Sequence, residues 1–117
     1  MLEDRTGDLV VEVTRHDAHA VVSVRGEIDL STADRFRAAM DEAMRGCGSV
    51  EVDLAGTTFM DSSGLAVLVG AHQRLGQAQE ALVVRDPSPT IRKVLQISGV
   101  GALLDVRPPL DDDTAQS

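Results

Sequence analysis

The sequence predicts an α/β fold: a mixed, mostly parallel β-sheet of about five strands that opens with a hairpin and has about three to four helices packed over it. After residue 30, segments with the helical spacing of apolar residues alternate with short apolar segments typical of strands. Strand–helix–strand connections within one sheet require parallel pairing with right-handed crossovers. The first two strand-like segments instead follow one another directly, which predicts an antiparallel pair.

The predicted hairpin lies at the start of the chain. Residues 9–13 and 20–25 are rich in valine and have the character of strands, and residues 15–19 form the turn between them. His16 and His19 lie in this turn. We interpret them as solvated residues, because no third metal ligand lies near them in the sequence.

The first helix is predicted to begin at Ser31 or Thr32. Residues 31–34 have the spacing of a capping box, with aspartate in place of the usual glutamate, and Asp29 is a further candidate acceptor for the free N–H groups of the helix. Gly46 suits a left-handed stop. The side chains expected to face the core form one apolar stripe at helical spacing: Ala33, Phe36, Met40, Ala43 and Met44.

A strand and the second helix follow. Residues 50–54 alternate apolar and acidic side chains, so we expect a strand that Gly56 ends, and residues 55–60 are predicted to form a loop. His72 falls on the apolar stripe of the helix that follows and is interpreted as a half-buried structural residue. The apolar residues of that stripe recur at helical spacing up to Gly76: Leu65, Leu68, Val69 and Leu75.

The last third of the chain contains a strand, a helix and a further strand. Residues 81–84 form a short apolar run, which is typical of a central strand buried on both faces. Ser88 is predicted to cap a helix with Pro89 at its first position, and Gly99 to end it. Residues 103–106 are expected to form an edge strand.

Composition and length indicate one domain, residues 1–117, with residues 1–8 and 108–117 as poorly ordered tails. The formal net charge of −8 argues against binding to nucleic acid or an anionic membrane, and it favours solubility or steering toward a basic partner. Cys47 is the only cysteine, so neither an internal disulfide nor a four-cysteine metal site is possible. No segment resembles a signal peptide or a membrane span, and we expect a cytoplasmic protein.

Residues 61–64, Asp-Ser-Ser-Gly, lie at the junction between the strand pattern and the helix pattern. A helix start carries free N–H groups and a partial positive charge, so Asp61 or Ser62 suits an N-cap and an anion is stabilised there. Local chemistry alone does not decide whether this junction is only a helix cap or also a functional site. The junction follows the carboxyl end of a strand, where open α/β sheets usually place their sites.

Three segments carry a family resemblance: residues 26–30 (Gly-Glu-Ile-Asp-Leu), 53–54 (Asp-Leu) and 59–65 (Phe-Met-Asp-Ser-Ser-Gly-Leu). In order and spacing they resemble bacterial anti-sigma factor antagonists of the STAS domain family, from about residue 9 to about residue 106. The resemblance implies that a partner anti-sigma factor serine kinase phosphorylates Ser63, close to Asp29. It also implies that the unphosphorylated protein binds that kinase, which releases its sigma factor. A C-terminal helix usual in the family is not expected in residues 110–117.

The expected partners are that kinase, which brings ATP and magnesium, and a phosphatase that resets Ser63. Ser62 is the second candidate acceptor. We expect a monomer or weak homodimer that needs no cofactor or metal and is not an enzyme. The residues predicted to contact the kinase lie within residues 27–31 and 61–67: Glu27, Asp29, Ser31, Asp61, Ser62, Gly64, Leu65, Ala66 and Val67.

Two alternatives stay open. The chain could be a constitutive scaffold or interaction module of a signalling or transport assembly, in which the serine pair is only a helix cap. A hydrolase using Ser63 is weaker, because the Gly-x-Ser-x-Gly elbow is absent. The three acidic residues 111–113 lack the spaced ligands of a calcium site and are interpreted as a solvated tail.

Overall fold

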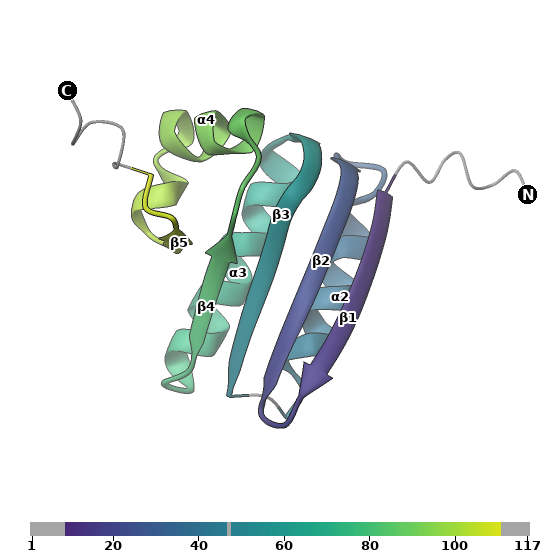
Figure 1. Cartoon of the computed structure of the whole chain (residues 1–117), viewed down its shortest axis with the longest axis vertical. Helices are drawn as coiled ribbons and strands as arrows, with labels where there is room; N and C mark the ends of the chain where they lie inside the picture. Colours follow the sequence, from purple (N-terminus) through teal and green to yellow (C-terminus); the bar gives the residue numbers. More distant parts are fainter. Residues whose placement is uncertain (1–8, 47, 111–117) are drawn as a thin grey trace, which may run out of the picture.

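The structure is a computed structural model and describes residues 9–46 and 48–110. In these residues a five-stranded sheet has the order β1-β2-β3-β4-β5, with β1 and β2 antiparallel and every other neighbouring pair parallel (Figure 1). The predicted fold class is confirmed. The elements are β1 (Leu9–His16), β2 (His19–Ile28), α2 (Ala33–Met44), β3 (Ser49–Met60), α3 (Ser62–Gln77), β4 (Ala81–Arg85), α4 (Pro89–Ser98), the 3₁₀ helix η1 (Val100–Ala102) and β5 (Asp105–Arg107).

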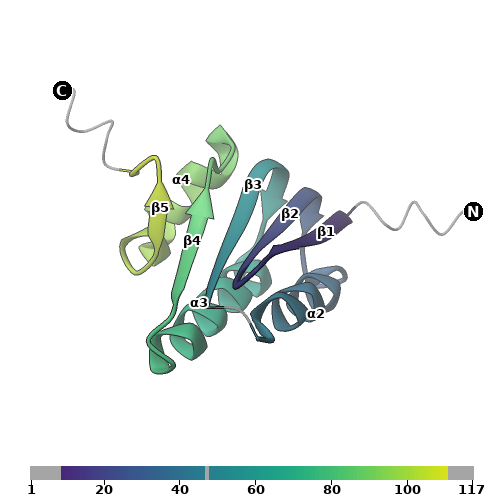
Figure 2. The same ribbon diagram turned by 60° about the horizontal axis from the view of Figure 1, so that its bottom comes forward.

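The core lies between the sheet and helices α2 and α3, which cover the same face of the sheet (Figure 2). Alternate residues of the strands, such as Val22 and Val52, are completely buried beneath them. Phe36 of α2 and Leu68 of α3 fill the space from the helix side. The apolar stripe predicted for the first helix is confirmed, with four of its residues buried and Met44 partly buried.

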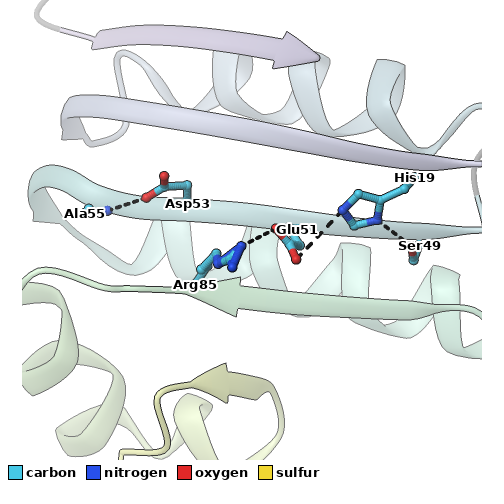
Figure 3. Close-up of polar contacts among 6 residues, drawn as sticks. All are labelled: His19, Ser49, Glu51, Asp53, Ala55 and Arg85. Carbon is cyan, nitrogen blue, oxygen red and sulfur yellow. Dashed lines mark hydrogen bonds and ion pairs between the residues drawn. The ribbon is translucent and has the colours of Figure 1, made fainter. Parts of the chain in front are cut away.

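The opposite face of the sheet carries polar side chains and is not covered by any described helix (Figures 1 and 3). The prediction that residues 81–84 are buried on both faces is therefore wrong: Leu82 and Val84 are buried, but Val83 is only partly buried. On this face Glu51 lies between two nitrogen-bearing side chains, 2.9 Å from Arg85 and 3.8 Å from His19 (Figure 3).

The sequence suggested that His19 is a solvated turn residue, and this prediction is wrong: His19 is a strand residue. The hairpin turn consists of Asp17 and Ala18 only, so β2 already begins at residue 19. The ring nitrogen Nδ1 of His19 lies 2.7 Å from the Ser49 hydroxyl on β3. The longer hairpin thus brings this histidine into contact with β3.

Strand β3 continues to Met60, so the prediction of a loop at residues 55–60 is wrong. Relative to β2, β3 inserts one additional residue between Asp53 and Gly56 and another between Thr57 and Phe59. Each insertion shifts the side-chain alternation. The residues of β3 that face the core after Leu54 are consequently three apart, at Thr57 and Met60, and the period of two disappears from the sequence.

The boundaries of α2 and α4 agree closely with the prediction. Helix α2 begins at Ala33, just after the expected position. Helix α4 begins with Pro89, and Gly99, whose φ is 82°, is its C-cap. The last strand is β5, at 105–107 and not at 103–106, because η1 occupies the chain immediately before.

The end of the described chain is attached to α4. Arg92 donates hydrogen bonds to the carbonyls of Pro108 and Pro109, and Gln96 donates to that of Leu110. These three residues therefore do not belong to a poorly ordered tail, as was predicted for 108–117. The predicted tails at 1–8 and 111–117 lie outside the described residues.

Thr57 makes a testable contribution to the extended pairing of β2 and β3. Its buried hydroxyl donates to the carbonyl of Val24, which lies at a register shift. Thr57→Val leaves that carbonyl without this donor, and we expect the free energy of unfolding to fall by about 1–3 kcal/mol. Thr58→Val is the matched control, since the exposed Thr58 hydroxyl donates to Gly26, and its effect should stay within about 0.5 kcal/mol. Urea unfolding measures both, and equal losses would contradict the assignment.

Candidate functional site

Two acidic turns meet at one end of the sheet. β2 and β3 are parallel neighbours, and their pairing ends with Ile28 opposite Met60, so the turns that follow lie side by side. The backbone N–H of Asp61 donates to the carbonyl of Ile28 over 3.1 Å and joins the two turns directly. At this end, the upper one in Figure 1, helices α2 and α3 begin. The sheet thus brings Asp29 and Asp61 together.

The second turn is built around the carboxylate of Asp61. Its extended backbone makes it the N-cap of α3, and its Oδ1 accepts a hydrogen bond from the backbone N–H of Ser63 at 2.8 Å. The same oxygen accepts the Ser63 hydroxyl at 2.5 Å. Asp61 is therefore the cap, and the hydroxyl of Ser63 is held by it. Ser62 is exposed, whereas Ser63 is partly buried.

The first turn repeats this arrangement around Asp29. Its Oδ1 accepts the backbone N–H of Ser31 at 2.9 Å, the Ser31 hydroxyl at 2.7 Å and the backbone N–H of Thr32 at 3.1 Å. Asp29 is an acceptor, as predicted, but its carboxylate accepts from the N–H groups of the turn before α2 and not from those of the helix itself, which begins at Ala33. The capping box predicted at residues 31–34 does not form, because the Ser31 hydroxyl donates to Asp29 and lies outside α2.

Thr32 is a site residue that the sequence reasoning missed. Its buried hydroxyl donates to the carbonyl of Glu27 and accepts the backbone N–H of Asp29, both at 2.9 Å. It thereby fixes the turn that presents Asp29. A threonine directly before an apolar helical stripe was the available signal, but the pattern suggested only a cap.

Both carboxylates are more acidic than usual. The hydroxyl of Ser63 lowers the pKa of Asp61, and the backbone N–H groups of the turn add to this effect. The hydroxyl of Ser31 likewise lowers the pKa of Asp29. The negative charge of Asp29 acts in the opposite direction on the pKa of Asp61 and only partly offsets this lowering, because the two carboxylates repel one another. At neutral pH the site presents two like charges.

Two residues predicted to contact the kinase face the core instead. Gly64 and Val67 lie on the buried side of α3, and Val67 is only 5% exposed. A β-carbon at Gly64 would lie 2.6 Å from Cγ of Met60 and 2.7 Å from Cγ2 of Ile28. This side of the first turn therefore packs on the ends of β2 and β3, while Ser62 and Ala66 on the other side are exposed.

The other predicted contact residues are at least partly open to solvent. Glu27, Ser31, Ser62 and Ala66 are exposed, and Asp29, Asp61 and Leu65 are partly buried. Two large apolar side chains in the same segments are also exposed, Leu30 by 82% and Phe59 by 46%. Neither is among the residues predicted to contact the kinase, although each lies within a segment that carries the family resemblance.

The described residues offer no group of three or more His, Cys, Asp or Glu side chains that could hold a metal ion. In the same part of the chain, no helix combines the length and the apolar character that crossing a membrane requires.

The family model described as Mlab, STAS domain, matches residues 11–105. The chain belongs to the STAS domain family. Among curated relatives of this STAS protein, the anti-sigma F factor antagonist of Paenibacillus polymyxa is 33% identical over 101 residues, which are 85% of this chain and 86% of the relative. The anti-sigma-B factor antagonist of Listeria monocytogenes is 31% identical over 102 residues, covering 86% and 90%.

Solved structures give the same assignment for this STAS domain. An anti-sigma factor antagonist from Mycobacterium paratuberculosis superposes with a TM-score of 0.78 at 28% identity, covering 92% of each chain. The anti-sigma factor antagonist SpoIIAA in its unphosphorylated form superposes with a TM-score of 0.72 at 25% identity, covering 91% of this chain and 92% of that one. The resemblance identified from residues 26–30, 53–54 and 59–65 is confirmed.

The ionised carboxylate of Asp61 should stabilise the STAS domain in a pH-dependent way. Because its pKa is lowered in the folded state, this stabilisation is present above about pH 4 and is lost as the pH falls through the lowered value. The difference in unfolding free energy between the natural protein and Asp61→Asn should shrink as the pH falls below about 4. Urea unfolding at a series of pH values measures it. Ser63→Ala should weaken the same dependence, and a difference that is constant with pH would contradict the assignment.

Proposed function

We propose that this STAS protein is an anti-sigma factor antagonist whose unphosphorylated form binds an anti-sigma factor serine kinase and frees its sigma factor. Phosphorylation of Ser63 switches this binding off. The observation that carries the proposal is the Ser63 hydroxyl, held at 2.5 Å by Asp61 at the start of α3 and beside a second carboxylate. The names of the relatives support antagonism of an anti-sigma factor, and all of the named antagonists match most of this chain.

Phosphorylation would replace the attraction between Ser63 and Asp61 by repulsion. The Ser63 hydroxyl now donates a hydrogen bond to Asp61, and an ester oxygen in its place has no proton to donate. The phosphate adds about −1.5 to −2 charges next to two ionised carboxylates. Repulsion would turn the phosphate away from Asp61 and toward solvent, where a docked partner would have to desolvate it.

The fold itself should tolerate the modification. The N-terminus of α3 carries free N–H groups and the positive end of the helix dipole, which stabilise a nearby anion. The energetic penalty therefore falls on binding and not on folding. Changing a partner from almost fully bound to almost fully free requires about 10⁴-fold in affinity, or about 5.5 kcal/mol.

The transfer step is supplied by the kinase. ATP, bound with magnesium, provides the phosphoryl group. The Ser63 oxygen forms the new bond to the γ-phosphorus, the bond from that phosphorus to the bridging oxygen breaks, and ADP and the hydroxyl proton leave. A phosphatase would hydrolyse the phosphoserine and restore the hydroxyl. Ser62 remains the second candidate acceptor because its side chain is exposed, although it lacks the contact with Asp61 that Ser63 makes.

The docking surface combines the two carboxylates with exposed apolar side chains. Leu30 and Phe59 lie in the segments that carry Asp29 and Asp61, and Ala66 lies one helical turn after Ser62. Apolar anchors surrounded by charge are the usual composition of an interface with a few dominant contacts. A phosphate on Ser63 would lie within this surface.

Phosphorylation is tested by intact mass and site mapping after incubation with the cognate anti-sigma kinase, ATP and magnesium. We expect one added phosphate, which Ser63→Ala loses and Ser62→Ala retains. The phosphorylated protein should bind the kinase about 10³ to 10⁴-fold more weakly than the unmodified protein. A phosphate that only Ser62→Ala abolishes would assign the switch to Ser62. Equal binding before and after phosphorylation would favour the constitutive scaffold.

The docking surface is tested separately with exposed positions, where the fold should tolerate a charge. Leu30→Asp and Ala66→Glu should each weaken binding of the unphosphorylated protein to the kinase by about tenfold or more, measured by calorimetry. Ile97→Asp is the matched control, because Ile97 is 79% exposed on α4, against 82% for Leu30 on the turn. Unchanged affinity in both site variants would place the interface elsewhere.

A further inference from the structure

The two serines at the start of α3 have the same chemistry but different surroundings. Ser62 is the first residue of the helix and Ser63 the second, directly after the cap Asp61. The side chain of an N-cap reaches the second and third positions of a helix, and the first position lies outside its reach. Ser63 accordingly makes two contacts with Oδ1 of Asp61, whereas no hydrogen bond joins the Ser62 hydroxyl to another described residue.

The contact with Asp61 fixes the direction in which the Ser63 oxygen can react. The hydroxyl donates its proton to the carboxylate at 2.5 Å, so the lone pairs of the oxygen point away from Asp61. Ser63 is partly open to solvent, and a γ-phosphate can approach the oxygen from that side. The Ser62 side chain is not held in any one of its three staggered rotamers. The turn thus presents only one of the two oxygens in a fixed orientation.

The same contact favours phosphoryl transfer. As the Ser63 oxygen bonds to phosphorus it loses electron density, its proton becomes more acidic, and the hydrogen bond to the carboxylate strengthens. An interaction that is stronger in the transition state than in the ground state raises the rate. The carboxylate is ionised at neutral pH, because its pKa is lowered in this turn. The proton that Asp61 holds passes to solvent as the phosphoserine forms.

We propose that Asp61 is the positioning residue that selects Ser63 over Ser62 as the phosphate acceptor. This selection rests on the proposed function, since the kinase must transfer a phosphate to this turn for any choice to exist. It differs from helix capping in what it needs from the side chain. A cap needs an acceptor oxygen, which asparagine also offers, whereas a firm hold on the hydroxyl needs the negative charge.

Single-turnover kinetics resolved by site test the selection. With kinase, ATP and magnesium saturating, the rate is that of the assembled complex, and mass spectrometry follows Ser62 and Ser63 in the same molecule. Asp61→Asn, which keeps the cap, should slow transfer to Ser63 by about fivefold, and Asp61→Ala by at least about tenfold. The rate at Ser62 should stay low and unchanged, so the ratio of Ser62 phosphate to Ser63 phosphate rises in both variants. Because both serines share one chain, this ratio is independent of kinase affinity and of stability.

Asp53→Asn is the matched control. The Asp53 carboxylate likewise accepts the N–H of the second residue after it, at 2.9 Å from Ala55, but it lies on the open face of the sheet (Figure 3). This variant removes the same charge and should leave both rates within about twofold of the natural protein.

The outcomes separate the selection from the proposed function. A natural protein phosphorylated on Ser63, with a site ratio that Asp61→Asn leaves unchanged, would reduce Asp61 to a helix cap. That result would overturn the selection and leave the proposed function intact. A natural protein that gains no phosphate, or gains it only on Ser62, would overturn both.

Discussion

The parallel pairing of β2 and β3 over their full length is the constraint on which the site depends. Without the last part of this pairing, the turns at Asp29 and Asp61 would lie on unrelated loops. The pairing continues past two inserted residues in β3, and the buried hydroxyl of Thr57 satisfies the carbonyl of Val24 where the register shifts. The bond from Asp61 to the carbonyl of Ile28 then fixes the spacing of the two turns.

At this end of the sheet the chain balances two opposing electrostatic effects. Two carboxylates repel one another, but each is stabilised by serine hydroxyls and by backbone N–H groups at the start of a helix. The ionised state is therefore compatible with the fold, although it leaves little capacity for further negative charge at the surface. The same hydroxyl that stabilises Asp61 is the proposed phosphate acceptor, which connects the local stability of the turn with the proposed switch.

Because α2 and α3 cover one face of the sheet only, its other face and its β1 edge are open in the residues that the structure describes. Because α2 and α3 cover only that face, the opposite face carries charged pairs such as Arg85 with Glu51, and these remain partly solvated. The helices also leave the β1 edge without a neighbouring strand in the described part of the chain.

The sequence by itself determined the main helices and strands and their order. The spacing of apolar residues at 50–54 and from Leu65 onward predicted a strand and a helix. Proline and glycine marked the two ends of α4. These signals are local, and tertiary contacts did not override them. Only the tertiary structure decided where β3 ends, because bulges replace the period of two by a spacing of three and the partner strand supplies the missing hydrogen bonds. It likewise placed Val67 and Gly64 in the core and exposed Leu30, since the side of a helix or turn that is buried depends on what packs against it.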